Sequence, residues 1–292
     1  MPCINPQDAH LPIASESKQF RLGPSTSAFE KKIKIPCGVC EPCLFDYSDT
    51  WKTHATLEAL MWKNSLFLTL TYNEKNLTYI ENEPSLYYKH VQEFQRKFRR
   101  AFGECKFMNA GEYGERKGRP HFHVIVFGNF PEIFKGKQVG VGKRGDPCYL
   151  SQQFTNLWGH GTAYTGDVEP ATIGYVADYG LKNGYQKQWY KYLKNEDGTY
   201  VTDDDGKRRD FYLVDKDAGE IVEKKRPFMK ISLKPAIGLK WLERYWRDVY
   251  SDGVIVLPNG VKKPAPRAFD NWMIDQGSIQ EEMVLALKHD RE

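Results

Sequence analysis

The chain has 292 residues, of which 40% are hydrophobic and 27% are charged, a composition typical of a globular protein. Its formal net charge of +4 is only mildly basic and does not by itself indicate a nucleic-acid partner. There is no run of about 18 apolar residues, which excludes a membrane-spanning helix, and the first residues lack the layout of a signal peptide. We therefore expect a cytoplasmic protein without membrane association, whose six cysteines are reduced or bound to metal.

The N-terminal residues 1–36 are polar, contain several prolines and show no hydrophobic period, so we expect an irregular arm. Cys37, Cys40 and Cys43 follow at the spacing of zinc ligands. A tetrahedral zinc site needs a fourth ligand, which a histidine or one of the remaining cysteines could supply: Cys3, Cys105 or Cys148. The alternative is a reduced cluster with a structural role. If zinc is bound, we expect it to fasten the N-terminal arm.

Hydrophobic periodicity predicts an alternation of helices and strands after the cysteines. The expected helices cover residues 44–64, 85–102, 152–158 with Ser151 as N-cap, 170–183 and 236–250, and the last twenty residues also look helical. The expected strands cover residues 66–72, 106–113, 121–127 and 162–168, and an Asn-Gly hairpin signal lies within 254–261. A turn-like basic linker joins 106–113 to 121–127, which predicts an antiparallel hairpin.

Basic residues cluster at two places in this pattern. The C-terminal half of the helix over 85–102 carries four cations: Arg96, Lys97, Arg99 and Arg100. The hairpin linker adds three more: Arg116, Lys117 and Arg119. All seven are candidates for contacts to DNA phosphates. For the helix, the alternative is a solvated end whose cations suit the macrodipole.

Two histidines begin the apolar strand over 121–127. Residues i and i+2 of a strand point to the same face, so His121 and His123 project together while Phe122 and Val124 pack on the other side. Two neighbouring imidazoles are half of a site for a divalent metal. The alternative is a pair of packed core histidines.

A carboxylate on the neighbouring strand could complete this metal site. Glu112 and Glu115 both lie near the expected hairpin, and we favour Glu112 because it lies within the strand. A mixed histidine and carboxylate site with open positions suits Mg²⁺ or Mn²⁺ acting as a Lewis acid. The alternative for Glu112 is a surface glutamate without a ligand.

A pair of tyrosines follows at helical spacing. Tyr175 and Tyr179 are four residues apart, which places both on one helix face, and Lys182 lies about one turn further on. A phenol with a pKa of about 10 is a poor nucleophile at neutral pH. It can attack a phosphodiester that a metal polarises, which yields a covalent phosphotyrosine link, and Lys182 could stabilise the charge. The alternative is an aromatic stripe that packs on the sheet.

These motifs, taken in order, resemble those of rolling-circle replication initiators, the HUH endonucleases. The resemblance rests on Phe67–Tyr72, Gly111–Glu115, Gly118–His123 and the Tyr175, Tyr179 and Lys182 pattern. The layout most resembles the initiators of microviruses, small single-stranded DNA bacteriophages, and especially the gokushovirus branch. The Met1-Pro2-Cys3 start, the cysteine cluster and the motif over residues 229–238 also fit that branch.

The resemblance implies an enzyme that nicks and rejoins single-stranded DNA at a replication origin. His121 and His123 would bind the metal, and Tyr175 and Tyr179 would be the two nucleophiles. One tyrosine holds the 5′ phosphate while the free 3′ hydroxyl primes synthesis, and the second cleaves after a full circle. A host replication helicase and polymerase would be partners in the bacterial cytoplasm, and Thr69 and Thr71 would lie near the site.

Asp178 departs from the pattern of these relatives, which tend to carry Lys or Arg between the tyrosines. A carboxylate there would repel phosphate unless it points away or helps to bind the metal.

We expect an α+β fold with a central, mainly antiparallel sheet, the histidines on a middle strand and helices packed against one face. The expected organisation is an N-terminal arm with the cysteine cluster (1–43), an endonuclease core (44–183), a polar insertion (184–226) and a C-terminal extension packed on the core (227–292). Alternative functions are a relaxase or transposase of the same chemistry, a non-catalytic nucleic-acid-binding module, or a metal-dependent nuclease that uses water.

Overall fold

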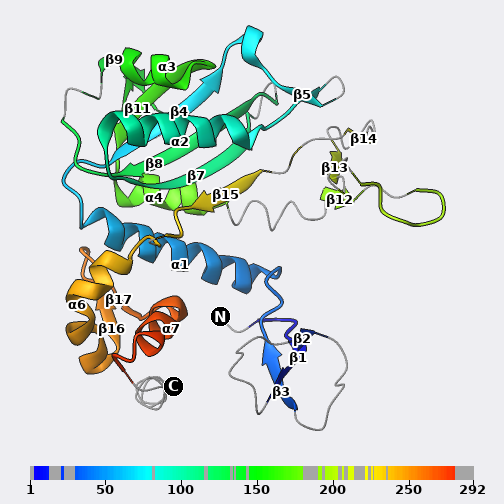
Figure 1. The fold of residues 1–292 in the computed structure, drawn as a ribbon, viewed down its shortest axis with the longest axis vertical. Helices are drawn as coiled ribbons and strands as arrows, with labels where there is room; N and C mark the ends of the chain where they lie inside the picture. The colour runs from blue at the N-terminus through cyan, green and yellow to red at the C-terminus, as the bar shows by residue number, and fades with distance from the viewer. Residues whose placement is uncertain are drawn as a thin grey trace.

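The structure is a computed structural model. It describes residues 3–12, 21–22, 30–80, 83–114, 118–131, 134, 136–142, 145–179, 190–192, 195–202, 206, 210–213, 221–222, 225, 227–234 and 236–279. Figure 1 shows its arrangement, in which a large sheet with helices lies above the long helix α1 (Glu41–Ala59) and a smaller C-terminal unit lies below it.

Seven strands form one antiparallel sheet, which confirms the expected α+β fold. Their order is β15 (Phe228–Ile231), β7 (Lys106–Tyr113), β8 (Pro120–Phe127), β4 (Leu66–Tyr72), β11 (Gly161–Asp167), β10 (Pro147–Leu150) and β9 (Lys137–Val141). The predicted hairpin is present as β7 and β8, paired so that Glu112 lies opposite His121 and Ala110 opposite His123. The histidine strand β8 lies between β7 and β4, well inside the sheet.

Helices cover both faces of this sheet, so the expectation that they pack against one face was wrong (Figure 1). On one face, α2 (Tyr88–Phe102) and α3 (Gln152–Trp158) bury aromatic residues against Leu68, Leu70 and Phe122. On the other face, α1 and α4 (Pro170–Ala177) pack against Met108 and Ile125. The strands in the middle of the sheet carry apolar side chains on both faces. Each face therefore needs helices to cover it.

Local chemistry explains where the helices of this core begin and end. The Ser151 side chain accepts a hydrogen bond from the Phe154 N–H at the start of α3, as predicted for an N-cap. Gly159 ends α3 with φ of 73°, a left-handed conformation that favours glycine. Pro170 opens α4 behind a capping box formed by Glu169 and Thr172. α4 ends at Ala177, before the predicted end near residue 183, and residues 180–183 lie outside the described ones.

The N-terminal residues form strands where an irregular arm was expected. β1 (Gln7–Pro12) pairs with both β2 (Arg21–Leu22) and β3 (Glu30–Ile35) in a small antiparallel sheet. The Asp8 carboxylate on β1 forms ion pairs with Lys32 and Lys34 on β3. This pairing joins residues far apart in sequence, and the polar composition of the strands hides the period-2 pattern that local analysis detects.

The C-terminal region packs on the far side of α1 (Figure 1). It comprises α6 (Leu239–Asp252), the predicted hairpin of β16 (Val254–Val256) and β17 (Lys262–Pro264), and α7 (Arg267–Asp275). Leu57 of α1 is buried among Leu242, Val249 and Phe269 of this region. α1 therefore lies between two hydrophobic cores, with Ala55 in one and Leu57 in the other.

The remaining described strands are short. β12 (Tyr190–Tyr192), β13 (Asp210–Leu213) and β14 (Ile221–Val222) form a separate sheet inside the expected insertion over 184–226, most of which lies outside the described residues. β5 (Tyr79–Ile80) and β6 (Glu83–Pro84) pair after the single-turn helix η1 (Glu74–Asn76). Among the helices in the described ranges, none combines the length and apolar composition needed to cross a bilayer.

Candidate metal centre and tyrosine pair

Three candidate ligands meet on the face of the sheet that α4 covers. The Glu112 Oε1 atom lies 2.7 Å from Nε2 of His121 and 2.9 Å from Nε2 of His123. The register of β7 and β8 produces this arrangement, because Glu112 lies directly opposite His121, and His123 follows two residues along the same face. Glu112 and His121 are half-buried and His123 is buried, so the cluster lies at the boundary between core and solvent.

The two imidazole rings are held by hydrogen bonds at their other nitrogen atoms. His121 Nδ1 lies 3.2 Å from the Arg119 carbonyl oxygen, and His123 Nδ1 lies 3.1 Å from Thr69 Oγ1. Phe67 stacks on the His123 ring with an interplanar angle of 6°. Such outer contacts are typical of metal-binding histidines, because they fix the ring and the tautomer.

The hydrogen-bond pattern of this cluster has a place for a proton or a metal ion between its histidines and Glu112. A carbonyl oxygen only accepts, so the contact with Arg119 places the proton of a neutral His121 on Nδ1. Its Nε2 lone pair then faces a Glu112 oxygen at 2.7 Å, which is unfavourable unless a proton or a metal ion lies between them. The three ligand atoms all lie within 4.8 Å of one another. The residues therefore fit a divalent cation, with the mixed nitrogen and oxygen donors that Mg²⁺ or Mn²⁺ tolerates.

The charge state of Glu112 suits this role. Burial alone would raise the pKa of the Glu112 carboxyl, but the hydrogen bonds to His121, His123 and Tyr179 lower it well below its usual range. Glu112 is therefore an ionised carboxylate at neutral pH, and its negative charge suits a cation at this cluster.

Both tyrosines, one in α4 and one just after it, reach this cluster. The Tyr175 hydroxyl lies 3.1 Å from Glu112 Oε1 and 3.2 Å from His123 Nε2. The Tyr179 hydroxyl donates to the Tyr175 hydroxyl at 2.5 Å. Tyr175 lies in the last turn of α4 and Tyr179 two residues beyond its end, on the same side as the four-residue spacing predicted. Lys182 and Glu115 lie outside the described residues.

The two tyrosines differ in exposure. Tyr179 is only 1% exposed, whereas Tyr175 is half-buried. Burial, followed by the contacts with the Glu112 carboxylate and Tyr175, raises the pKa of Tyr179 far above its usual range. In this arrangement Tyr179 is a neutral phenol that contacts Glu112, and the Tyr175 oxygen contacts both Glu112 and His123.

Asp178, the residue that departs from the expected pattern, points away from the cluster. Its carboxylate accepts a hydrogen bond from Ser48 Oγ at 2.7 Å and pairs with Lys52 Nζ at 2.7 Å, both on α1. The negative charge of Asp178 is therefore balanced by Lys52 of α1. The same contacts attach the segment that carries the tyrosines to α1, close to where the tyrosines reach the cluster.

The predicted DNA contacts lie in different places. The four cations of α2, Arg96, Lys97, Arg99 and Arg100, belong to the helix on the opposite face of the sheet from the tyrosines. Arg119 lies beside His121, where its guanidinium binds Glu74 and the Tyr72 carbonyl oxygen. Arg116 and Lys117 lie outside the described residues. The structure therefore places Arg119 next to the cluster, through its carbonyl oxygen, whereas the α2 cations lie on the other face of the sheet. The DNA contacts of all these residues remain predictions.

A second ligand cluster forms around the start of α1. Cys3, Cys37, Cys40 and Cys43 converge, whereas Cys105 is buried in the core behind the sheet and Cys148 lies on β10. Of the candidates for the fourth sulfur, the fold selects Cys3.

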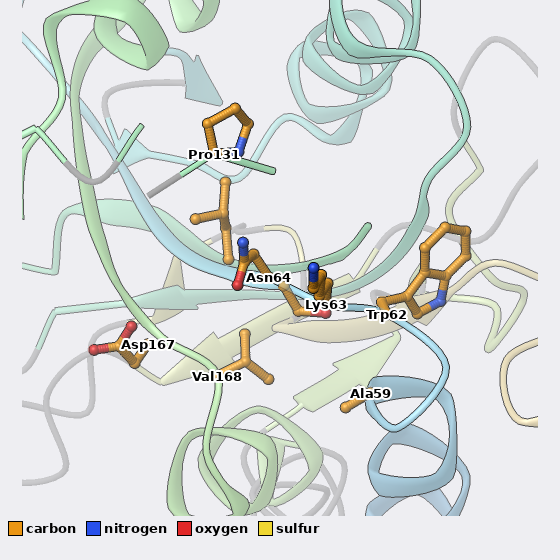
Figure 2. A pocket seen from close by; sticks show the side chains of 9 residues that line it. Ala59, Trp62, Lys63, Asn64, Pro131, Asp167 and Val168 are labelled. Carbon is orange, nitrogen blue, oxygen red and sulfur yellow. The ribbon is translucent and has the colours of Figure 1, made fainter. Parts of the chain in front are cut away.

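The pocket in Figure 2 lies elsewhere on the sheet. It has a volume of about 220 Å³ and is lined by residues at the end of α1, the start of β4 and the end of β11, among them Trp62, Asn64 and Asp167. None of the clustered histidine, glutamate or tyrosine residues lines it. The candidate centre lies toward the other end of β4, where Thr69 and Thr71 pair with His123 and His121.

Sequence reasoning did not assign several supporting residues. Thr69 was expected near the site without a role, and its contact with His123 follows from the pairing of Thr69 with His123 across β4 and β8. The roles of Ser48 and Lys52 could not be predicted from local pattern, because their partner Asp178 is more than one hundred residues away in the sequence. Ser48 and Asp178 are 130 residues apart.

Comparison with known proteins links the chain to phage replication. Residues 65–184 match the family described as replication-associated protein ORF2/G2P, a range that contains all five residues of the cluster. The replication-associated protein VP4 of Bdellovibrio phage phiMH2K is 28% identical over 281 residues, which is 93% of this chain and 77% of that protein.

Two further relatives match a shorter stretch. The replication-associated protein ORF4 of Chlamydia phage 1 is 34% identical, and the replication-associated protein ORF2 of Spiroplasma virus 4 is 28% identical, each over 155 residues. These matches cover 51% of this chain but only 38% and 48% of the two relatives. No solved structure shows a significant match to the chain.

Proposed function

We propose that this chain, a relative of the microvirus-like replication-associated proteins of phages, nicks and rejoins single-stranded DNA at a replication origin. The replication role rests on these relatives, and the chemistry rests on the cluster of Glu112, His121, His123, Tyr175 and Tyr179. The enzyme would be a HUH-type endonuclease that initiates rolling-circle replication.

The observation that carries this proposal is the position of the Tyr175 hydroxyl. It contacts Glu112 Oε1 and His123 Nε2, two of the three candidate metal ligands, at 3.1 and 3.2 Å. A nucleophile at this distance can reach a phosphate held at the same centre. An ordinary aromatic stripe would pack its rings on the sheet without directing a hydroxyl group at two metal ligands.

The reaction is a transesterification, so it needs no external energy source. The Tyr175 oxygen attacks the scissile phosphorus, a tyrosine O–P bond forms and the bond from phosphorus to the 3′ oxygen breaks. The phenol loses its proton and the leaving 3′ oxygen gains one, so atoms and charge balance. Mg²⁺ or Mn²⁺, held by Glu112, His121 and His123, would polarise the phosphate as a Lewis acid. The 5′ phosphate stays on the enzyme, and the free 3′ hydroxyl can prime synthesis.

The second tyrosine would perform the closing step. Tyr179 is hydrogen-bonded to Tyr175 at 2.5 Å and also contacts Glu112, so its hydroxyl lies at the same centre. After a full circle, Tyr179 would attack the regenerated origin, and the released 3′ hydroxyl would attack the Tyr175 phosphodiester to close the displaced strand. Rolling-circle synthesis between the two steps would use a helicase and a polymerase of the bacterial host, in the host cytoplasm.

The decisive experiment looks for the covalent intermediate. Single-stranded oligonucleotides that tile the genome encoding this chain are incubated with the protein and Mn²⁺, with a label at the 3′ or the 5′ end. We expect a denaturant-resistant adduct from one 3′-labelled oligonucleotide. The matching 5′-labelled one should yield a shorter product that a polymerase can extend.

Matched variants separate this chemistry from its alternatives. The double variant Tyr175→Phe and Tyr179→Phe should form no adduct, whereas Tyr245→Phe on α6, far from the cluster, should behave like the wild type. An adduct in the double variant would refute the assignment of the nucleophiles. Cleavage with a free 5′ phosphate and no adduct would indicate a nuclease that uses water. Metal-independent binding without cleavage would indicate a non-catalytic binding module.

A further inference from the structure

The four-cysteine cluster at the start of α1 is outside the proposed reaction. Cys37 and Cys40 precede α1, Cys43 lies in its first turn, and Cys3 comes from the N-terminal segment just before β1. Their four sulfur atoms all lie within 4.8 Å of one another. All four are free thiols in the structure, and three of them are only half-buried.

The sulfur positions match a tetrahedral metal site. The Cys40 Sγ atom lies 3.4 Å from Cys43 Sγ and 3.7 Å from Cys3 Sγ. Four sulfur atoms that surround zinc at about 2.3 Å lie about 3.8 Å from one another. A disulfide would instead require about 2.05 Å between two sulfur atoms. The spacing therefore excludes a disulfide between these atoms and fits metal ligation.

The backbone around the cluster supports negative charge on the sulfur atoms. The Cys37 N–H donates to Cys3 Sγ at 3.3 Å, and the Cys40 N–H donates to Cys37 Sγ at 3.4 Å. Gly38 has φ of 69°, a left-handed conformation that turns the chain between Cys37 and Cys40. These contacts orient the ligands and stabilise thiolates, as outer contacts do around metal sites.

The start of α1 lacks the usual helix cap. Cys40 occupies the N-cap position, where a sulfur atom stands in place of the side-chain oxygen that Ser, Thr, Asp or Asn would supply. A zinc ion with four thiolates carries a net charge of about −2, which is favourable beside the positive end of a helix dipole. Ligation by Cys40 and Cys43 would then fix the first turn of α1 in place of a polar cap.

We propose that Cys3, Cys37, Cys40 and Cys43 bind one structural zinc ion. With four protein ligands the site is closed, so the ion has no position for substrate and serves the fold. It joins the segment that leads into β1 to the first turn of α1, which brings the N-terminal sheet and the helix together (Figure 1). α1 in turn holds the tyrosine segment through Ser48, Lys52 and Asp178.

The first test measures zinc in the full-length protein. Protein produced in zinc-supplemented medium and purified without chelators should contain one zinc per chain by elemental mass spectrometry. Cys3→Ser and Cys40→Ser should lose most of this zinc. Cys148→Ser, on β10, is the matched control and should retain it. Zinc-free wild-type protein, or full zinc in both Cys3→Ser and Cys40→Ser, would overturn the proposal.

A second measurement does not depend on the folding of the variants. Wild-type protein loaded with Co²⁺ in place of zinc should show the intense visible d–d absorption and the thiolate charge-transfer bands of a tetrahedral sulfur site. The variant with His121→Ala and His123→Ala should give the same spectrum, because it keeps all four cysteines. The weak absorption of an octahedral site, or a spectrum that disappears with the histidines, would overturn the proposal. Neither measurement requires DNA cleavage, so the proposal of a zinc site is tested independently of the proposed nicking activity.

Discussion

The two ligand clusters of this protein are built in contrasting ways. Glu112, His121 and His123 lie on two neighbouring strands and span 11 residues between Glu112 and His123. In the cysteine cluster, 34 residues separate Cys3 from Cys37, and no backbone pairing joins the four cysteines directly. The ligands of the first cluster lie on the paired strands themselves, whereas the four cysteines lie beyond the paired residues of β1 and β3, where a shared ion would join them to each other.

This difference indicates what an ion would contribute at each cluster. The ladder between β7 and β8 holds the candidate ligands in place, so an ion there would supply chemistry to a preformed site. The pairing of β1 with β3 brings Cys3 near Cys37, but the cysteines themselves lie outside that ladder, so an ion there would add stability by joining the N-terminal sheet to α1. The predictions below test this contrast, beginning with the largest expected effect.

Removal of both histidines should abolish nicking with little effect on the fold. His121→Ala with His123→Ala removes two ligands of a Lewis acid worth several kcal/mol, so the nicking rate should fall on the order of 10⁴-fold. The denaturation midpoint should change little, because the ladder of β7 and β8 remains. Rates on a labelled oligonucleotide and urea denaturation measure the two effects.

The matched control for the histidines is a second pair on the other side of the sheet. His90 and His160 stack with ring centroids 3.8 Å apart, and His90→Ala with His160→Ala should leave metal-dependent nicking near the wild-type rate. Equal losses in the two double variants would contradict the assignment of the metal site.

Glu58 tests whether α1 holds the large sheet and the C-terminal region together. Its buried carboxylate binds Lys106 Nζ of β7 at 2.9 Å and the Gly238 N–H at 2.6 Å. Glu58→Ala leaves a buried, unpaired lysine, so the free energy of unfolding should fall by about 3–5 kcal/mol. The double variant Glu58→Ala with Lys106→Met should recover part of this loss. A denaturation midpoint within error of the wild type for Glu58→Ala would show that this ion pair does not hold α1 on the sheet.

Thr69 tests how strongly the ladder orients a ligand. Thr69→Val keeps the shape of the side chain but removes the oxygen that lies 3.1 Å from His123 Nδ1. The Mn²⁺ concentration for half-maximal nicking should rise about 10–100-fold, with the zinc content unchanged. Thr71→Val is the control, because Thr71 Oγ1 donates to the Thr162 carbonyl oxygen. Similar metal requirements in the two variants would show that Thr69 does not orient His123.

The smallest effect concerns pH. His54 of α1 is 3% exposed, its Nδ1 lies 3.0 Å from the Ile237 carbonyl oxygen, and burial lowers its pKa. The unfolded chain therefore binds a proton below about pH 6.5 that the folded chain resists, so stability falls as the pH drops through this range. The expected slope is at most about 1.4 kcal/mol per pH unit. Urea denaturation at pH 7.5, 6.5 and 5.5 measures it, and His54→Gln should show a smaller slope. An equal slope in both proteins would exclude His54 as its source.

Much of the sheet core followed from local pattern. The strands over 66–72 and 106–113, the hairpin to the histidine strand and the Ser151 cap lie as predicted, because period-2 apolar runs and turn residues encode them locally. The N-terminal sheet was missed, because its strands are polar and pair across a long separation. The covering of both sheet faces was also missed, since periodicity shows which side of a helix is apolar but not which face of the sheet it meets.

The sequence by itself determined which candidate groups share a face, and this sharing is the basis of the chemistry that we propose. Two histidines at i and i+2 and two tyrosines at i and i+4 share a face for reasons of strand and helix geometry alone. The tertiary structure decided which groups meet: Tyr175 with Glu112 and His123, Asp178 with Ser48 and Lys52, and Cys3 with the three later cysteines. The physical reason is that spacing fixes directions within one element, whereas contacts between elements depend on the packing of the whole chain.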